Sequence, residues 1–317
     1  MITEQALLHL PEILTGSGYP EQHYESSIVS AFSLALLQSL NGRNVPNPIS
    51  CLQTEKPFRG RDGWPRPAPE TPRYLRADLN VRLHQMKVGS KRLAAYGWRH
   101  DNWIESKFFR GEAPNKQVNT GSLLADLLRI LALVPSVRAR KYPDHEITGR
   151  FLLHVYEGLD PVPYHQMNKQ TGGSSEPRRW LAPLMTSGRN KCESILLSNY
   201  EAGGILGEIN ANLGEIQIQF DATTFRVEPA IDLGEDFTQY TCILSRIDAF
   251  KLIRGQTSLE VRADRLVIET PNKDAVTAEI REHVGRFIST KVSGVEAKQP
   301  DESEVDDEEP ADEQAAP

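Results

Sequence analysis

Cysteine is scarce in this chain of 317 residues, and its three copies lie far apart. Cys51, Cys192 and Cys242 form no CxxC pair and have no histidine close by in the sequence. A disulfide framework or a zinc site needs several such residues at short intervals, so the sequence indicates neither. The three thiols are expected to be reduced and packed inside the protein.

Long apolar runs are also missing from the sequence. No stretch approaches the roughly 18 apolar residues of a membrane-spanning helix, and the start, MITEQALLHLPEIL, carries acids in place of a basic leader. The glycine pair in NKQTGGSSEPRR lacks the GxxxxGK[ST] pattern of a phosphate-binding loop, so no ATPase motif is present. The sequence predicts a soluble, cytoplasmic globular protein without a membrane partner.

Charge is distributed unevenly along the chain. The net charge is −7, but residues 296–317 hold ten acids and one lysine, and without this −9 segment the remainder is at +2. Residues 55–116 contain fourteen Lys or Arg against seven Asp or Glu, with several Trp and Tyr between them. Cations interleaved with aromatic rings are typical of a nucleic-acid surface, and an ordinary basic, loop-rich surface is the equal alternative.

Hydrophobic periodicity divides the chain into a mixed N-terminal half and a strand-rich C-terminal half. Apolar spacing predicts helices at about 20–40, 119–134 and 272–289 and strands at 74–83, 102–109 and 150–158. Residues 43–73 are predicted to form a loop. Beyond residue 193 the clearest strands are GEIQIQFD, TFRVEPA and SLEVRADRLVIET, and an S-x-x-D capping box at Ser245 and Asp248 predicts a short helix.

The stretch NWIESKFF, residues 102–109, places two opposite charges on one side of a predicted strand. Alternation puts Trp103, Glu105, Lys107 and Phe109 on one face and Ile104, Ser106 and Phe108 on the other. An edge strand with mutually supporting charges is one interpretation. A metal and water site is the other.

Two short motifs favour the second interpretation. RADLNV contains Asp78, and WIESKF follows with Glu105-x-Lys107, after a predicted helix that carries Glu25. Together with the order helix, strand, strand, helix, strand, these motifs resemble the PD-(D/E)xK nuclease superfamily over roughly residues 20–160. Ala77 stands where the pattern has proline, and the connection between the two strands is longer than a tight hairpin.

The resemblance implies an α/β fold with a restriction-endonuclease-like mixed sheet flanked by helices. The predicted domains are residues 1–190, nuclease-like; residues 191–292, mostly β; and residues 293–317, a disordered acidic tail. The resemblance also implies that Asp78, Glu105 and Lys107 are the catalytic residues. The implied cofactor is Mg²⁺, and its implied ligands are Asp78, Glu105, the Ser106 carbonyl and Glu25. A solvated strand face for Asp78 and an ordinary helix surface for Glu25 remain alternatives. Burial and neighbouring acids would shift the pKa of Lys107 in opposite directions.

The expected activity is endonucleolytic hydrolysis of nucleic acid in restriction, phage defence or DNA processing. DNA is favoured over RNA as the substrate. The predicted nucleic-acid contacts are Arg59, Arg61, Arg66, Arg76, Lys91, Arg92 and Arg99. The alternative is a non-catalytic nucleic-acid-binding subunit of a larger assembly. In either case the C-terminal domain is a candidate surface for a protein partner or a second copy of the chain.

Overall fold

A computed structural model describes most of the regular elements of the chain. The described residues are 2–16, 25–58, 76–83, 101–110, 116–134, 148–158, 160–161, 164–165, 181–196, 216–228, 239–254, 257–262 and 265–268. The helices are α1 (Ile2–Gly16), α2 (Glu25–Asn41), α4 (Lys116–Leu133), α5 (Ala182–Met185) and the 3₁₀ helix η2 (Pro48–Cys51). The strands are β1 (Leu52–Pro57), β2 (Arg76–Arg82), β3 (Asp101–Phe109), β4 (Thr148–Glu157), β5 (Gly188–Leu196), β6 (Ile216–Val227), β7 (Tyr240–Arg254), β8 (Thr257–Arg262) and β9 (Arg265–Ile268).

These strands form a single sheet in the described part of the chain. Its order is β1-β2-β3-β4-β7-β6-β5, with β8 paired to β7 and β9 to β8. The pair β3–β4 is parallel and the other pairs are antiparallel. A parallel pair needs a crossover connection, and the chain between β3 and β4 contains α4. The predicted mixed α/β class is confirmed.

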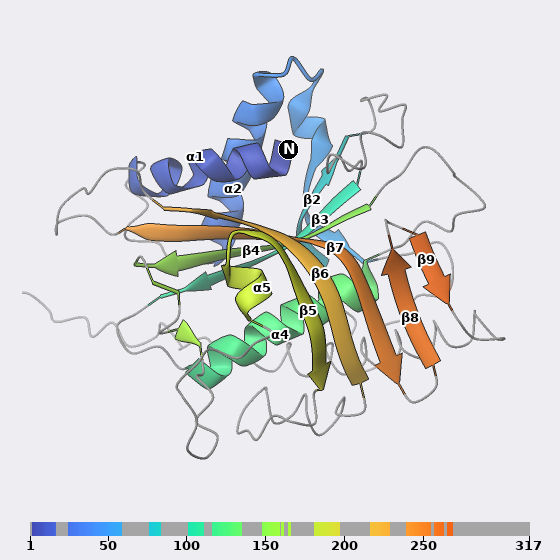
Figure 1. Ribbon diagram of the computed structural model, residues 1–317. Coiled ribbons are helices and arrows are strands. Elements are labelled where there is room, and N and C mark those ends of the chain that lie inside the picture. Colours follow the sequence, from blue (N-terminus) through green and yellow to red (C-terminus); the bar gives the residue numbers. More distant parts are fainter. Residues whose placement is uncertain are drawn as a thin grey trace, which may run out of the picture.

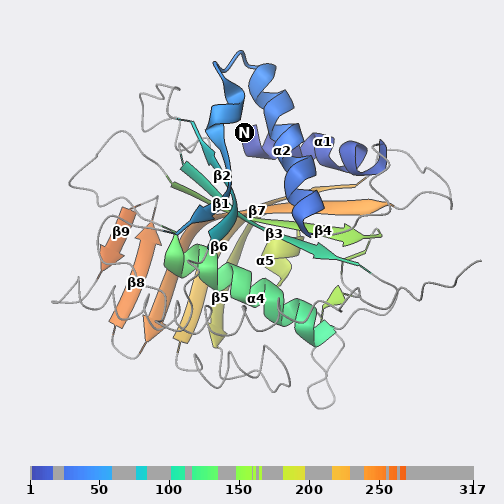
Figure 2. The same cartoon turned by 180° about the vertical axis from the view of Figure 1, so that it is seen from behind.

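Helices cover both faces of the sheet (Figure 1). One apolar cluster joins α1 and α2 to residues of β2, β3, β4 and β7, and a second cluster lies on the opposite side, against α4 and α5. Seen from behind, α4 runs across the near face of the sheet, in front of β5 and β6 (Figure 2). Layers of helices on both faces of a sheet bury the apolar residues of both strand faces.

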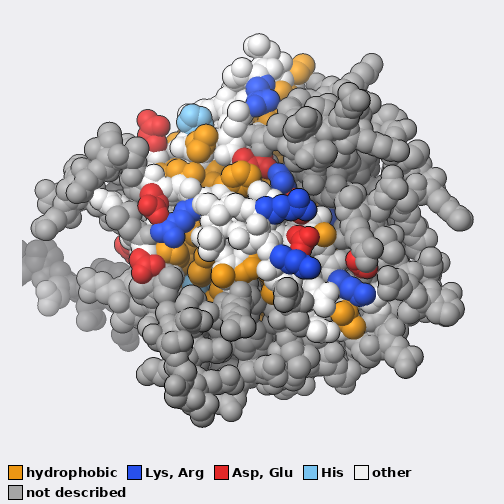
Figure 3. Space-filling model, viewed as in Figure 1, with side chains coloured by type: hydrophobic (Ala, Val, Ile, Leu, Met, Phe, Trp, Pro, Cys, Tyr) orange, Lys and Arg blue, Asp and Glu red, His pale blue; other side chains and the backbone are white. Residues whose placement is uncertain are grey.

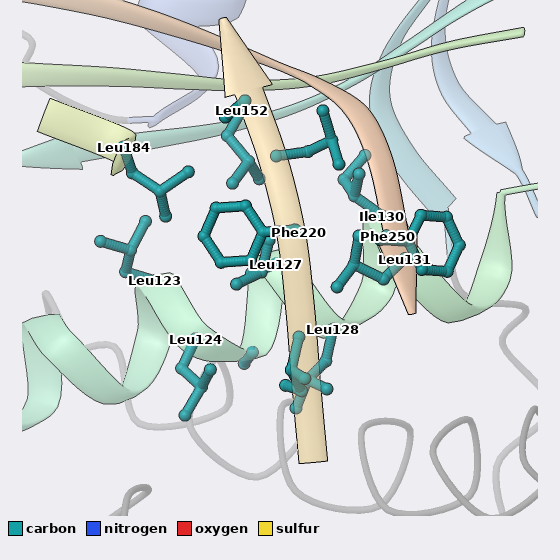
Figure 4. Close-up of a cluster of buried hydrophobic side chains, with 14 of the residues drawn as sticks. Leu123, Leu124, Leu127, Leu128, Ile130, Leu131, Leu152, Leu184, Phe220 and Phe250 are labelled. Atoms are coloured by element: carbon teal, nitrogen blue, oxygen red, sulfur yellow. The ribbon is translucent and has the colours of Figure 1, made fainter. Parts of the chain in front are cut away.

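Helix α4 is held by its leucines. Leu123 and Leu127 point from α4 toward Phe220 of β6 and Leu152 of β4, and all four side chains are fully buried (Figure 4). The leucines recur at three- and four-residue intervals, which places them on one stripe of the helix. This packing fixes the height and rotation of α4 over the sheet, and so it also fixes the polar side chains that α4 carries.

Most predicted elements of the N-terminal half are present. The predicted strands at 74–83, 102–109 and 150–158 correspond to β2, β3 and β4, and the helices correspond to α2 and α4. The loop expected at 43–73 was wrong in part, because η2 and β1 lie within it. Helix α1 was not predicted.

The short helix predicted from Ser245 and Asp248 is wrong, because both residues lie inside β7. Ser245 Oγ hydrogen-bonds with Thr224 Oγ1 at 2.9 Å, and Asp248 Oδ1 accepts from Arg246 Nε at 2.7 Å. These side chains therefore bond across the sheet and along the strand instead of capping a helix. The two predicted strands within 214–230 are one strand, β6, with an irregularity between Asp221 and Ala222.

The sheet runs through both predicted domains. Strand β7 pairs with β4, and the predicted boundary at 190/191 falls inside β5, so the division into domains stays a prediction. The helix expected at 272–289 and the tail at 293–317 lie outside the described residues. None of the described helices has the length and apolar character needed to cross a membrane. All three cysteines are buried and free, as predicted.

Candidate active site

The residues predicted from the two motifs come together in the structure. Glu25 begins α2, Asp78 lies in β2, and Glu105 and Lys107 lie in β3. Lys107 Nζ donates to Glu25 Oε2 at 2.9 Å, and the backbone N–H of Ser106 donates to Asp78 Oδ2 at 2.6 Å. One helix and two strands therefore supply a single charged site.

Asp78 lies where two strand pairings become irregular. The ladder between β2 and β3 runs as far as the Leu79–Ile104 pair, and the next pair in that register would be Asp78 with Glu105. Strand β1 stays paired with β2 beyond this point, but its register skips Glu55, whose φ of 52° is left-handed. Such breaks in a ladder free side chains and backbone groups for other contacts. Here the Asp78 carboxylate accepts a hydrogen bond from the backbone N–H of Ser106 in β3, which lies beyond the end of the ladder.

Strand β3 is an interior strand of the sheet, between β2 and β4. Trp103 and Phe109 belong to the apolar cluster beneath α4, whereas Ile104 and Phe108 pack with the cluster of α1 and α2. The predicted alternation of faces is confirmed. The edge-strand interpretation is wrong, and the Glu105 side chain is only 1% exposed.

Sequence reasoning missed two residues of the site, Asp126 and Arg129 of α4. Arg129 Nη1 lies 3.1 Å from Glu105 Oε2 and 3.3 Å from Asp126 Oδ1. Both α4 residues are buried, and their spacing of three places them on one side of the helix. The signal in the sequence was a charged pair inside an otherwise leucine-rich segment, LLADLLRILAL.

Burial and mutual repulsion raise the pKa of three carboxyl groups of the site, those of Glu25, Asp78 and Glu105. Burial, followed by the charge of Glu25, raises the pKa of Asp78 to about 7, against the hydrogen bond from Ser106. Burial and the charge of Asp78 raise the pKa of Glu105 well above its ordinary value, although Arg129 opposes this. Burial also raises the pKa of Glu25. Desolvation and neighbouring negative charges both disfavour ionised carboxylates.

Lys107 behaves in the opposite way. Burial lowers its pKa, but the negative charges of Asp126 and Glu25 and the hydrogen bond to Glu25 outweigh burial, so its pKa is raised. The structure thus answers a question that the sequence left open. Lys107 is a permanent cation at neutral pH, and its side chain is 24% exposed.

The site as a whole has an excess of negative charge. Its six interacting groups are Glu25, Asp78, Glu105, Asp126, Lys107 and Arg129. Four carboxylates against two cations give a net charge of −2 when every group is ionised. Glu105 Oε1 is buried and has no hydrogen-bond partner among the described residues. In the described part of the chain no three His, Cys, Asp or Glu side chains are arranged to hold a metal ion.

Of the predicted nucleic-acid contacts, the structure describes Arg76 alone. Its side chain is exposed and lies 3.7 Å from Glu55. The other six, Arg59, Arg61, Arg66, Lys91, Arg92 and Arg99, lie outside the described residues. On the face seen in Figure 3, the described Lys and Arg side chains alternate with Asp and Glu. The predicted basic surface therefore stays a prediction, as does the Ser106 carbonyl as a ligand.

Comparison with known proteins gives no relative whose function could be considered for this chain. No protein-family model, no curated protein and no solved structure matches it. A functional proposal therefore depends on the chemistry of the site itself.

Proposed function

We propose that this protein is a Mg²⁺-dependent nuclease that hydrolyses phosphodiester bonds of DNA. One observation carries the proposal: Glu25, Asp78, Glu105 and Lys107, which are distant in sequence, share one site in which Glu105 is buried and the other three are half-buried. A buried group of carboxylates beside a permanent cation is expensive to maintain in a folded protein. Perturbed ionisable groups of this kind are typical of functional sites.

The donor set fits a magnesium ion. Mg²⁺ is commonly held by one or two carboxylates, with water and substrate phosphate oxygens completing its shell. Among the described residues, the buried Glu105 Oε1 has no hydrogen-bond partner, and no hydrogen bond engages Asp78 Oδ1. These two oxygens would hold the ion. Its double charge would favour the ionised form of the carboxylates and would balance the −2 of the fully ionised site.

The ion, when bound, supplies Lewis-acid stabilisation of negative charge on a phosphate oxygen and lowers the pKa of water. The chain's own residues supply the rest. Lys107 keeps its proton, so we assign it to stabilising the charge that develops at phosphorus and not to removing a proton from water. Glu25 orients the Lys107 ammonium through their 2.9 Å contact.

The Ser106 N–H fixes the rotation of the Asp78 carboxylate by donating to Oδ2. The other oxygen of Asp78 is thereby left for the ion. On the opposite side of the site, Arg129 holds Glu105 Oε2 in the same manner. Each of the two proposed ligand side chains is thus oriented by one hydrogen bond, which is how a protein keeps a site ready for substrate. The preference for DNA rests on the sequence resemblance and on the basic composition of residues 55–116.

A plasmid cleavage assay tests the proposal. Purified wild-type protein with Mg²⁺ should nick and linearise supercoiled plasmid, and Ca²⁺ should support DNA binding with little cleavage. Asp78→Asn and Lys107→Met should each lower the rate at least about 100-fold, the usual contribution of such a group. Lys191→Met, an exposed lysine of β5, is the matched control and should cleave like wild type.

Full activity of Lys107→Met would remove the assigned role of that residue. Absence of cleavage by the wild type under all divalent ions, with retained DNA binding, would support the alternative of a non-catalytic nucleic-acid-binding subunit.

A further inference from the structure

Helix α4 places a charged pair where its neighbours are leucines. Asp126 and Arg129 are 3% and 8% exposed, and the residues around them on α4, Leu127, Leu128 and Ile130, are completely buried. A buried ion pair seldom stabilises a fold more than apolar side chains of similar size would. The fold alone therefore gives little reason for this pair.

The geometry of Arg129 is that of a bridging cation. A single nitrogen, Nη1, lies 3.1 Å from Glu105 Oε2 on β3 and 3.3 Å from Asp126 Oδ1 on α4. Its pKa is raised, because the attraction of Glu105 and Asp126 exceeds the opposing effect of burial. The guanidinium is therefore a fixed positive charge between two carboxylates, one of which is a proposed ligand of the ion.

We propose that Arg129 is a positioning residue that occupies the place of a second divalent ion, so that the site binds one ion only. This inference rests on the proposed function. Arg129 engages Oε2 of Glu105 and leaves Oε1 as the single oxygen of that carboxylate for the ion. With Arg129 present, one divalent ion neutralises the net −2.

Without Arg129 the same site would have a net charge of −3. Glu105 Oε2 and Asp126 Oδ1 would then lose their shared cation, and both oxygens lie within 3.3 Å of one point, the present position of Nη1. Two carboxylates that face one point with no cation between them repel each other and attract a small divalent cation. A second ion is expected to bind there.

Counting bound Mn²⁺ tests the inference directly. Full-length protein is titrated with Mn²⁺ at pH 8, and free ion is followed by electron paramagnetic resonance. From each count we subtract the count for the same protein with the additional substitutions Asp78→Asn and Glu105→Gln. This background measures the ions bound by the acidic segment 296–317. Circular dichroism verifies that every variant is folded.

The expected counts are one ion for wild type, two for Arg129→Met and one for Arg129→Lys, which keeps the charge. Arg246→Met is the matched control. Arg246 is also a largely buried arginine with two carboxylate partners, but it contacts Glu4 through Nη1 and Asp248 through Nε, so no single nitrogen is shared by the two carboxylates. It should bind one ion. The Mg²⁺ dependence of single-turnover cleavage should follow a Hill coefficient of one in wild type.

Two ions in wild type, or one in folded Arg129→Met, would overturn the inference while leaving a metal-dependent nuclease intact. If Arg129→Met does not fold, two ions in Arg129→Lys would overturn it equally. No Mn²⁺ bound by wild type, together with no cleavage, would overturn the proposed function and this inference with it.

Discussion

Replacing Asp78 with asparagine should stabilise the folded protein above pH 7 when no divalent ion is present. The reason is the cost of the ionised carboxylate in its half-buried place beside Glu25. An amide of the same shape carries no charge, and its oxygen can still accept the hydrogen bond from the Ser106 N–H. Removing the Asp78 carboxylate, a group of the candidate active site, should therefore make the folded protein more stable.

The size of the effect follows from the pKa. A rise from the ordinary 3.8 to about 7 corresponds to roughly 4 kcal/mol between the protonated and ionised forms. Asp78 is only half-buried and shares its repulsion with Glu25, so solvent screening reduces this figure, and we expect about 2 kcal/mol.

The sign and the pH window follow from the same values. Below pH 3.8 the carboxyl group is protonated in both the folded and the unfolded protein, and it contributes nothing. Between 3.8 and about 7 the unfolded chain loses the proton while the folded protein keeps it, so wild-type stability falls as the pH rises. Above 7 the full cost is present. The advantage of Asp78→Asn should therefore be largest at pH 8 and less than about half of that at pH 5.

Urea unfolding with EDTA at pH 5 and pH 8 measures this difference. Glu55→Gln is the control, because the Glu55 side chain is 65% exposed, and its free energy of unfolding should change by less than about 0.5 kcal/mol. The reasoning would be refuted if Asp78→Asn were less stable than wild type at pH 8. It would also be refuted if the difference in the free energy of unfolding between variant and wild type were the same at both pH values.

Three further predictions concern DNA binding and the stability of the fold. Lys107→Ala should bind a DNA duplex within about threefold of wild type, measured by fluorescence anisotropy, because many phosphate contacts share the affinity. Glu4→Gln should lower the free energy of unfolding in urea by about 1.5 to 3 kcal/mol, since it weakens the contact of α1 with Arg246 of β7; an unchanged midpoint would contradict this. Truncation after Val292 should raise DNA affinity at low salt, with the difference vanishing as salt screens the ten acids removed; equal affinities at low salt would exclude competition by this segment.

The strands of the site could be predicted because each lies between two apolar layers. In β2, Leu79 and Val81 are buried, and in β3 the rings of Trp103 and Phe109 face one cluster while Ile104 faces the other. Alternation of this kind is visible in the sequence itself. Once β2 and β3 are neighbours, the positions of Asp78 and Glu105 follow.

Other features depend on contacts that no local pattern reveals. Helix α1 has apolar residues at helical spacing, but it contains Pro11, which is unfavourable inside a helix, so the local sequence gives conflicting indications. Ser245 and Asp248 fit a helix cap locally, yet pairing of β7 with β4 and β6 determines their conformation. The packing of α4 decides that Asp126 and Arg129 reach β3.

The pKa shift of Lys107 is likewise not predictable from local sequence. Its direction of pKa shift depends on Asp126, nineteen positions later in the sequence, and on Glu25, eighty-two positions earlier. The sequence could supply the lysine but not the balance between burial and these charges. Only the assembled site shows that the carboxylates prevail.

The most direct test of the account is anomalous X-ray diffraction from crystals of the protein soaked in Mn²⁺. The account predicts one anomalous peak per chain, in contact with Asp78 Oδ1 and Glu105 Oε1 and beside the Lys107 ammonium, with Arg129 still on Glu105 Oε2. Asp78→Asn crystals soaked in the same way should lose the peak. Clear density for these side chains with no peak between the two carboxylates, or with the ion bound elsewhere, would contradict the claim that they form a divalent-metal site.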